Sequence, residues 1–130
     1  MKVIDASALV ELLLGTPRGL LVADALVDEA ESIHMPHLAD VEVAHALRRL
    51  VAMKAVAERD ASEAIADLQD LDIDRHAHDP LLQRIWELRR NVSAYDAAYL
   101  ALAEVLGATL LTGDRKLAKV AGQTVRVVVI

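Results

Sequence analysis

The chain contains no cysteine and only three aromatic residues, one tryptophan and two tyrosines, among its 130 residues. The absence of cysteine excludes disulfides, thiolate zinc sites and a cysteine nucleophile, and it suits a reducing cytoplasm. Hydrophobic residues nevertheless make up 55% of the sequence, so the core must be aliphatic. The mean hydropathy of +0.31 is high for a soluble monomer and indicates an apolar surface for self-association or for a partner.

Basic charge, long apolar runs and linkers are also scarce. The net charge is −6 (14 − 20), which argues against a general nucleic-acid binder with a basic face. No apolar run approaches the roughly 18 residues that span a bilayer, and a strand is expected after only two residues, leaving no room for a signal peptide. No segment rich in proline, glycine or serine divides the chain. We therefore expect one cytoplasmic domain over residues 1–130 without a membrane segment.

Short apolar runs alternate with helical patterns along the chain. Strands are predicted at Met1–Ile4, Ile33–Met35, Leu71–Ile73, Ala108–Thr112 and Val125–Ile130. Helices are predicted at about Ser7–Leu14, Arg18–Ala30, Leu38–Met53, Asp60–Leu71, Asp79–Arg90, Ser93–Gly107 and Arg115–Val120. Asp60 to Glu63 has the pattern of a capping box, and Asp79 followed by Pro80 is typical of a helix start. The alternation favours a five-stranded parallel sheet with helices on both faces.

Four carboxylates lie where hydrophobic segments stop or start. Asp5 ends the opening apolar run, Asp114 follows Thr109–Gly113, Asp96 opens a strongly helical stretch, and Glu42 lies among apolar residues. Acids at the carboxyl ends of parallel strands point into the crevice where such sheets bind ligands. Two unit charges about 4 Å apart repel by about 4 kcal/mol at a surface-like dielectric, so a cation must resolve the conflict. All-oxygen ligands suit Mg²⁺ or Mn²⁺, which predicts divalent-metal chemistry on a phosphate-containing substrate.

Three of these acids also have a purely structural explanation. Asp5 and Asp114 could each cap the helix that follows, and Asp96 stands three residues after Ser93, where it could complete a capping box. Taken singly, capping explains each position as well as metal binding does. Glu42 lacks such an explanation, and buried acids are rare unless they are paired or bind a metal. A capping acid can also be a ligand, because the two roles use different oxygen lone pairs.

Hydroxyl and guanidinium groups accompany the acids. Ser7 and Thr112 could orient a carboxylate or a metal-bound water, or simply form a cap and a strand-end hydrogen bond. The pairs Arg48–Arg49 and Arg89–Arg90 could hold RNA phosphates, although surface arginines are more often solvated. These residues are therefore secondary candidates.

One face of the predicted long helix carries an acid, a histidine and an arginine. Glu42, His45 and Arg49 share a stripe of the predicted long helix, which would bring Arg49 toward a substrate or a neighbouring acid. The five histidines lack metal-site spacing. His76 and His78 fall in a polar stretch and are expected to be solvated.

Four segments in register resemble the PIN-domain family and, more narrowly, the VapC toxins of bacterial toxin–antitoxin modules. They are Met1–Val10, Val41–Val43, Tyr95–Ala103 and Leu110–Leu117. Each segment is a weak signal alone, but together they occur in the right order and cover essentially the whole chain. Leu117 is one departure, because many relatives carry an aromatic residue after the last acid; it concerns packing more than chemistry.

The resemblance implies a three-layer α/β/α sandwich with a central, mainly parallel five-stranded sheet. It implies a Mg²⁺- or Mn²⁺-dependent endoribonuclease, a homodimer, and a VapB-type antitoxin that blocks the acidic pocket, with DNA contacted only through that antitoxin. The family's acidic quartet matches Asp5, Glu42, Asp96 and Asp114 one for one, and its accessory hydroxyls match Ser7 and Thr112 less strictly. Asp5 and Asp96 are then the expected direct metal ligands. Glu42 or Asp114 would orient or deprotonate a water that cleaves RNA to a 5′-phosphate and a 3′-hydroxyl.

Three other functions are compatible with parts of the sequence. A receiver-type signalling domain would need adjacent acids after the first strand and a lysine at the end of the last, whereas this chain has Asp5-Ala6-Ser7 and only Arg126. A non-catalytic interaction module could keep the acidic pocket for a partner alone, although the intact quartet argues against it. A housekeeping RNA-processing nuclease would share the fold, and the short chain favours the toxin. The RNA target does not follow from the sequence.

Overall fold

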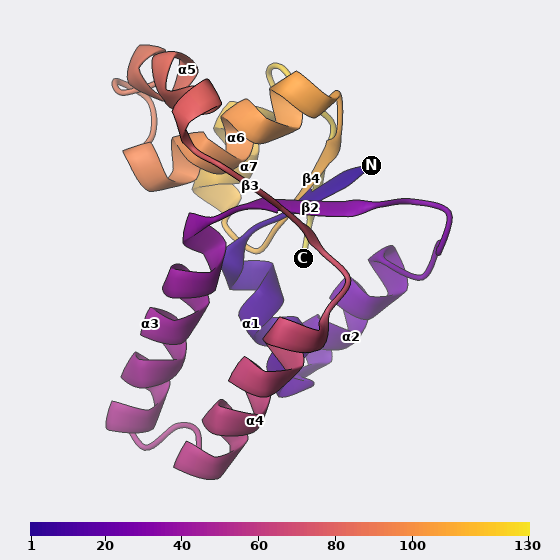
Figure 1. Ribbon diagram of the computed structural model, residues 1–130, viewed down its shortest axis with the longest axis vertical. Helices are drawn as coiled ribbons and strands as arrows, with labels where there is room; N and C mark the ends of the chain where they lie inside the picture. The colour runs from indigo at the N-terminus through magenta and orange to yellow at the C-terminus, as the bar shows by residue number, and fades with distance from the viewer.

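All five strands are parallel and form one sheet with the order β3-β2-β1-β4-β5 (Figure 1). The computed structural model describes residues 1–130. Its strands are β1 (Lys2–Ile4), β2 (Ile33–Pro36), β3 (Asp74–His76), β4 (Thr109–Thr112) and β5 (Val127–Val129). Its helices are α1 (Ala6–Leu14), α2 (Pro17–Ala25), α3 (Leu38–Ala52), α4 (Glu58–Asp70), α5 (Leu82–Glu87), α6 (Ala94–Leu106) and α7 (Arg115–Ala121), with a 3₁₀ turn, η1 (Asp79–Leu81), before α5.

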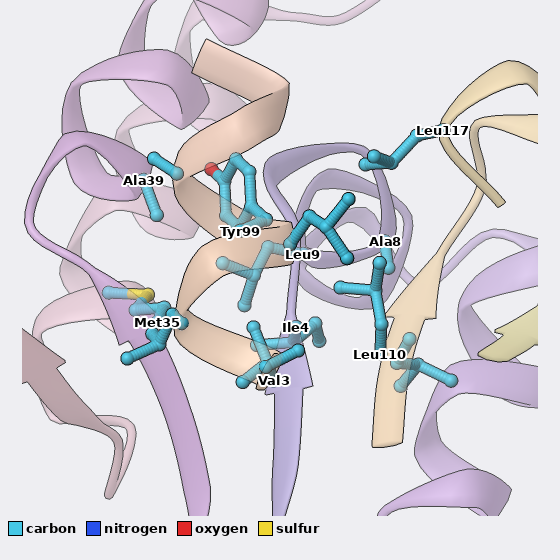
Figure 2. Close-up of a cluster of buried hydrophobic side chains, with 14 of the residues drawn as sticks. Val3, Ile4, Ala8, Leu9, Met35, Ala39, Tyr99, Leu110 and Leu117 are labelled. Atoms are coloured by element: carbon cyan, nitrogen blue, oxygen red, sulfur yellow. The ribbon is translucent and has the colours of Figure 1, made fainter. Parts of the chain in front are cut away.

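The sheet separates two layers of helices, which confirms the predicted α/β/α sandwich. Helices α1 to α4 lie on one face and α5 to α7 on the other (Figure 1). Residues 97 to 103 of α6 are all buried, and the four alanines among them let this helix approach the sheet closely. Figure 2 shows Tyr99 of α6 packed with Val3, Ile4 and Leu9 in this aliphatic core. Leu117, the departure from the family pattern, is 1% exposed and fills the same core.

The central strand β1 is the point at which the strand order reverses. The chain leaves β1 for β2 and β3 on one side and later places β4 on its other side. A parallel α/β sheet has a crevice at such a switch point, outside the carboxyl ends of the strands. Ile4 pairs with Leu111 in register, so the residues that follow β1 and β4 meet at that edge. The fold therefore brings Asp5 and Asp114 into one crevice.

Helices α1 and α2 cross tightly beside β1. Gly15 ends α1 in the left-handed region with φ of 63°, and the Thr16 side chain caps α2 by accepting from the Gly19 amide. A Cβ added to Gly19 would lie 2.0 Å from the Glu11 carbonyl oxygen, so only glycine permits this approach. No single helix is long and apolar enough to cross a membrane, and α1 and α2 meet those limits only as a pair bent by 111°.

Several predicted boundaries were wrong, most of them around polar segments. Helix α2 ends at Ala25 rather than Ala30, because the acidic stretch after it forms a turn. Helix α4 starts at Glu58, so Asp60 lies in its first turn and is not its cap. Asp79 begins a 3₁₀ turn, and α5 ends at Glu87 instead of Arg90.

Strand β3 lies three residues later than predicted. Its sequence Asp74-Arg75-His76 is polar, and apolar patterning alone favoured residues 71–73. The Arg75 guanidinium forms two hydrogen bonds to the Asp40 carboxylate of α3, at 2.7 and 3.1 Å, and one to the Leu68 carbonyl of α4 at 3.1 Å. Tertiary hydrogen bonds, and not apolar alternation, hold this edge strand.

The expectation that His76 and His78 are solvated was also wrong. Nε2 of His76 lies 2.9 Å from Nδ1 of His34, which is 6% exposed. Nε2 of His78 accepts a hydrogen bond from the Leu38 amide at 2.9 Å. The residue before α3, His37, provides no side-chain cap, so His78 serves as the acceptor for the first turn of that helix.

Candidate active site

Asp5 lies at the carboxyl end of β1 and is only 4% exposed. Its Oδ1 accepts hydrogen bonds from the Ala8 amide at 3.0 Å and from the Ser7 hydroxyl at 2.7 Å, and the Thr112 hydroxyl donates to Oδ2. Burial raises the pKa of the Asp5 carboxyl, the hydrogen bonds from Thr112, Ala8 and Ser7 oppose that shift, and the charge of Asp114 adds to it. Asp5 therefore caps α1 and also presents a carboxylate to the crevice.

The turn after β4 is joined to Asp5 through Thr112 and Ser7. The Thr112 hydroxyl, fully buried, accepts from the Asp114 amide at 2.9 Å, and the Ser7 hydroxyl accepts from the Gly113 amide at 3.0 Å. A Cβ at Gly113 would make a tight contact, 3.2 Å, with the Ser7 hydroxyl oxygen and would displace that side chain slightly. The two hydroxyls thus connect the ends of β1 and β4, consistent with the accessory positions predicted for them.

Asp114 caps α7 with one carboxylate oxygen. Its Oδ1 accepts from the amides of Lys116 at 2.8 Å and Leu117 at 3.1 Å. The other oxygen, Oδ2, makes no hydrogen bond to the protein and remains available to a ligand. Capping and ligand binding are therefore compatible at this residue.

Asp96 contributes a carboxylate whose one protein partner is the Ser93 hydroxyl. The Asp96 amide donates to that hydroxyl at 3.1 Å, but the carboxylate does not accept from the Ser93 amide, so only half of the predicted capping box forms. The carboxyl is half-buried. Burial raises its pKa, the charges of Asp114 and Asp5 raise it further, and the hydrogen bond with Ser93 opposes these effects only in part. No basic side chain forms an ion pair with Asp96.

Glu42 of α3 completes the group and is held by Tyr99 of α6. The buried Tyr99 hydroxyl donates to Glu42 Oε1 at 2.6 Å. Burial raises the pKa of the Glu42 carboxyl, the Tyr99 hydrogen bond opposes this, and the charges of Asp96 and Asp5 add to it. Burial and the neighbouring Glu42 also raise the pKa of the Tyr99 phenol, which therefore stays a donor. Sequence reasoning missed Tyr99, although its spacing of three residues from Asp96 puts both on one face of a helix.

The four carboxylates interact electrostatically at the switch point. The charge of Asp114 raises the pKa of Asp5 and of Asp96, and the charges of Asp5 and Asp96 raise the pKa of Glu42. As placed, no three acidic or histidine side chains converge closely enough to enclose an ion. Asp5 is fixed by hydrogen bonds to both carboxylate oxygens, whereas Glu42 and Asp114 are each held by one oxygen and keep the other free. An all-oxygen donor set with unresolved negative charge fits a hard divalent cation in its chemistry.

The predicted arginines occupy two separate places. Arg49 lines a cavity of about 530 Å³ between α1 and α3 together with Glu42 and Ser7, whereas His45 of the predicted stripe does not line it. Arg48 is exposed and does not line that cavity. Arg89 lies near α5, with its guanidinium carbon 4.6 Å from the centroid of the Trp86 ring. Arg90, the next residue, is exposed.

Arg18 was not anticipated. Its Nη2 donates to the Gly113 carbonyl at 3.4 Å and to the Ile130 carbonyl at 2.6 Å. This side chain connects α2 to the turn that carries Asp114 and to the last strand. Its partners are distant in sequence, and no local pattern could have revealed them.

Comparisons with known proteins agree with this architecture. A model of the PIN domain matches residues 2–123. Ribonuclease VapC1 of Mycobacterium tuberculosis is 44% identical over 121 residues, which span 92% of this chain and 90% of the relative. The crystal structure of PAE2754 from Pyrobaculum aerophilum has a TM-score of 0.71 at 25% identity, covering 97% of this chain and 82% of that one.

VapBC2 from Rickettsia felis, crystallised with a DNA fragment from its promoter, has the same fold. Its TM-score is 0.66 at 11% identity, covering 98% of this chain and 96% of that one. Sequence identity and fold thus agree over nearly the whole length. The chain belongs to the PIN-domain family and groups with its VapC members.

Proposed function

We propose that residues 1–130 form a single ribonuclease domain, the toxin of a toxin–antitoxin pair, which cleaves RNA in the cytoplasm and inhibits growth until its antitoxin neutralises it. The observation that carries this proposal is the group of four mutually repelling carboxylates at the β1/β4 switch point. The 44% identity to ribonuclease VapC1 supports the same conclusion.

The proposed cofactor is Mg²⁺, with Mn²⁺ as a substitute, because every available donor is an oxygen. Asp5 and Asp96 would hold the ion directly, with Glu42 and Asp114 as further ligands, directly or through water. When bound, a divalent cation supplies charge neutralisation, a polarised phosphate and an activated water. The hydrogen bonds from Ser7 and Thr112 keep the Asp5 carboxylate oriented for this role.

Glu42 is the strongest candidate for accepting the proton of the attacking water. Its Oε1 is occupied by the Tyr99 hydroxyl at 2.6 Å, so Oε2 is the free acceptor. Burial raises the Glu42 pKa, and a general base is more effective as its pKa approaches the working pH. In-line attack by water would leave a 5′-phosphate and a 3′-hydroxyl, without participation of the RNA 2′-hydroxyl.

The proposed partners follow from charge and from the family. The acidic pocket suits a cationic side chain of a VapB-type antitoxin, which would neutralise the carboxylates in place of a metal. Large apolar side chains remain exposed in the free chain, in keeping with a homodimer and a protein partner. Contact with DNA would occur only through the antitoxin.

The direct test is incubation of the purified protein with total cellular RNA and Mg²⁺, followed by mapping of the new RNA ends. We expect cleavage at defined sites with 5′-phosphate ends, loss of cleavage in EDTA, and recovery on adding Mg²⁺ or Mn²⁺. Expression of the wild-type chain should also arrest growth, and co-expression of the small neighbouring antitoxin gene should relieve the arrest. The nuclease assignment is refuted if expression does not arrest growth and the purified protein leaves RNA intact at every metal concentration.

Metal binding should stabilise the fold in a pH-dependent way. The pKa values of Asp5, Glu42 and Asp96 are raised in the folded chain, so the folded state holds more protons than the unfolded state just above the usual carboxyl range. The free energy of unfolding of the metal-free protein therefore falls as the pH rises from the usual carboxyl range through the folded pKa values of these groups. Below the usual carboxyl range they do not lower the stability. A cation would compete with those protons.

We expect about 10 mM Mg²⁺ to raise the melting temperature by a few degrees near pH 8 and by clearly less near pH 5. Thermal melts with Mg²⁺ or with an equal ionic strength of NaCl provide the comparison. Equal shifts at both pH values would mean that the ion binds somewhere other than these carboxylates.

A further inference from the structure

A cleft between α5 and the start of α6 lies outside the acidic quartet. It has a volume of about 690 Å³ and is lined mainly by apolar side chains, with Gln83, Arg89 and Ser93 as its polar members. Trp86 forms one wall and is 63% exposed, and Tyr95 next to the cleft is 65% exposed. Two of the three aromatic residues of the chain thus face solvent here. Core packing does not explain their presence.

Arg89 forms a cation–π contact with Trp86. Its guanidinium carbon lies 4.6 Å from the ring centroid of Trp86, and its Nη1 donates to the Trp86 carbonyl at 3.0 Å. Arg90 adds a second exposed positive charge in a chain with a net charge of −6. A flat aromatic ring next to guanidinium groups is the combination that binds nucleobases by stacking and phosphates by charge.

The cleft is fixed in place. The Arg84 guanidinium of α5 makes two hydrogen bonds to the Glu104 carboxylate of α6, at 2.8 and 3.1 Å, and Thr124 donates to the same carboxylate at 2.9 Å. This ion pair connects α5, a helix of only six residues, to the long helix behind it. These hydrogen bonds hold α5 against α6, the two helices that form the cleft.

The cleft lies directly beside the acids. Ser93 lines it, and the Ser93 hydroxyl accepts the Asp96 amide at 3.1 Å. Ser93 and Asp96 lie three residues apart, so their backbone positions differ by roughly 5 Å along the helix axis and share one side of α6. A nucleotide held in the cleft would therefore have its backbone close to Asp96.

We propose that this cleft binds an unpaired nucleobase of the RNA, stacked on Trp86 and steadied by Arg89, and so positions the adjacent phosphodiester on the acidic quartet. This inference rests on the proposed ribonuclease function and adds a substrate subsite to it. Local charge favours RNA over a second copy of the chain, because Arg89 and Arg90 attract a polyanion, whereas a two-fold dimer through this cleft would bring the same arginines of two copies together. The concave shape also fits a base better than a flat dimer surface does.

Trp86 is the only tryptophan, so its fluorescence reports on this cleft alone. The Asp96→Asn variant, expected to bind without cleaving, would be titrated with single-stranded 12-mers of oligoadenylate and oligouridylate. Inorganic polyphosphate serves as a polyanion without bases. We expect RNA to quench the fluorescence and polyphosphate to leave it unchanged. Equal quenching by polyphosphate, or none by RNA that binds in an anisotropy assay, overturns the stacking proposal.

Substitutions separate this subsite from the nuclease activity itself. Trp86→Ala should raise KM for RNA about tenfold or more with a smaller change in kcat, and Trp86→Phe should restore most of the affinity. Val105→Ala, which also truncates an exposed apolar side chain but lies on α6 outside the cleft, is the matched control and should keep the wild-type KM. If Trp86→Ala keeps the wild-type KM, the subsite is wrong although the nuclease stands. If the wild type never cleaves RNA, the proposed function fails first.

Light scattering of the same variants tests the rival occupant. The oligomeric state of Trp86→Ala should equal that of the wild type. A shift to a smaller species, with RNA affinity unchanged, would assign the cleft to a second copy of the chain and overturn the proposal.

Discussion

Asp96→Asn should abolish RNA cleavage and growth arrest while leaving the protein folded and slightly more stable without metal. Ser93 is the only residue whose hydrogen bond lowers the pKa of the Asp96 carboxyl, and asparagine keeps both the side-chain oxygen that can accept from it and the backbone amide that donates to it. The substitution does remove one of the charges that raise the pKa of Glu42. Loss of a group that orients a metal ligand typically lowers activity by about 10–100-fold, and loss of a direct ligand should lower it more. Relief of repulsion should contribute a few tenths of a kcal/mol to about 1 kcal/mol of stability.

Cleavage rates and thermal melts of the two proteins measure both effects. Asp70→Asn is the matched control, because it makes the same substitution at an exposed position on α4. The control should keep full activity, and its melting temperature should not change. An Asp96→Asn protein that still cuts RNA at the wild-type rate with Mg²⁺ present would remove Asp96 from the proposed metal site.

The sequence predicted the fold well where burial decides the structure. Strands β1 and β4 are continuous apolar runs with fully buried residues such as Val3 and Leu110, and such runs are typical of central parallel strands. Edge strand β3 was misplaced because its polar residues are held by Arg75 and its partners on α3 and α4. Hydrogen bonds between distant segments leave no periodic signal, so pattern reasoning could not find them.

The candidate site was predictable to a similar degree. Asp5 and Asp114 follow directly from strand ends, since parallel strands adjacent in the sheet align their carboxyl ends. The roles of Tyr99 and Arg18 depend on tertiary contacts between helices and turns far apart in the chain. The expectation that a capping acid can also be a ligand agrees with Asp114, which caps α7 with Oδ1 and leaves Oδ2 free.

Thr112→Val should weaken both the fold and the catalysis, because one buried hydroxyl serves two acids. It donates to Asp5 Oδ2 and accepts from the Asp114 amide at 2.9 Å. Valine has nearly the same shape but leaves the buried carboxylate and the amide without this partner, which costs about 1–3 kcal/mol for each such group. Misorientation of Asp5 should lower the cleavage rate by about 10–100-fold.

The pH dependence distinguishes a role in tuning Asp5 from simple loss of packing. The Thr112 hydrogen bond is the largest influence that lowers the Asp5 pKa, so its removal should raise that pKa further. The acidic limb of the pH–rate profile should then move to higher pH. The stability deficit relative to the wild type should be greatest at neutral pH and shrink as pH falls through the Asp5 pKa, since the lost bond favours the ionised carboxylate.

Thr112→Ser, which keeps the hydroxyl, should restore the wild-type profile, whereas Thr109→Val in the same strand should leave it unchanged. A Thr112→Val profile that keeps its wild-type midpoint while activity falls would make Thr112 a packing residue only. A shifted midpoint that serine restores would instead show that the hydroxyl sets the ionisation of Asp5. In that case the end of β4 controls the acid at the end of β1, and the parallel pairing of the two strands contributes to the chemistry as well as to the core.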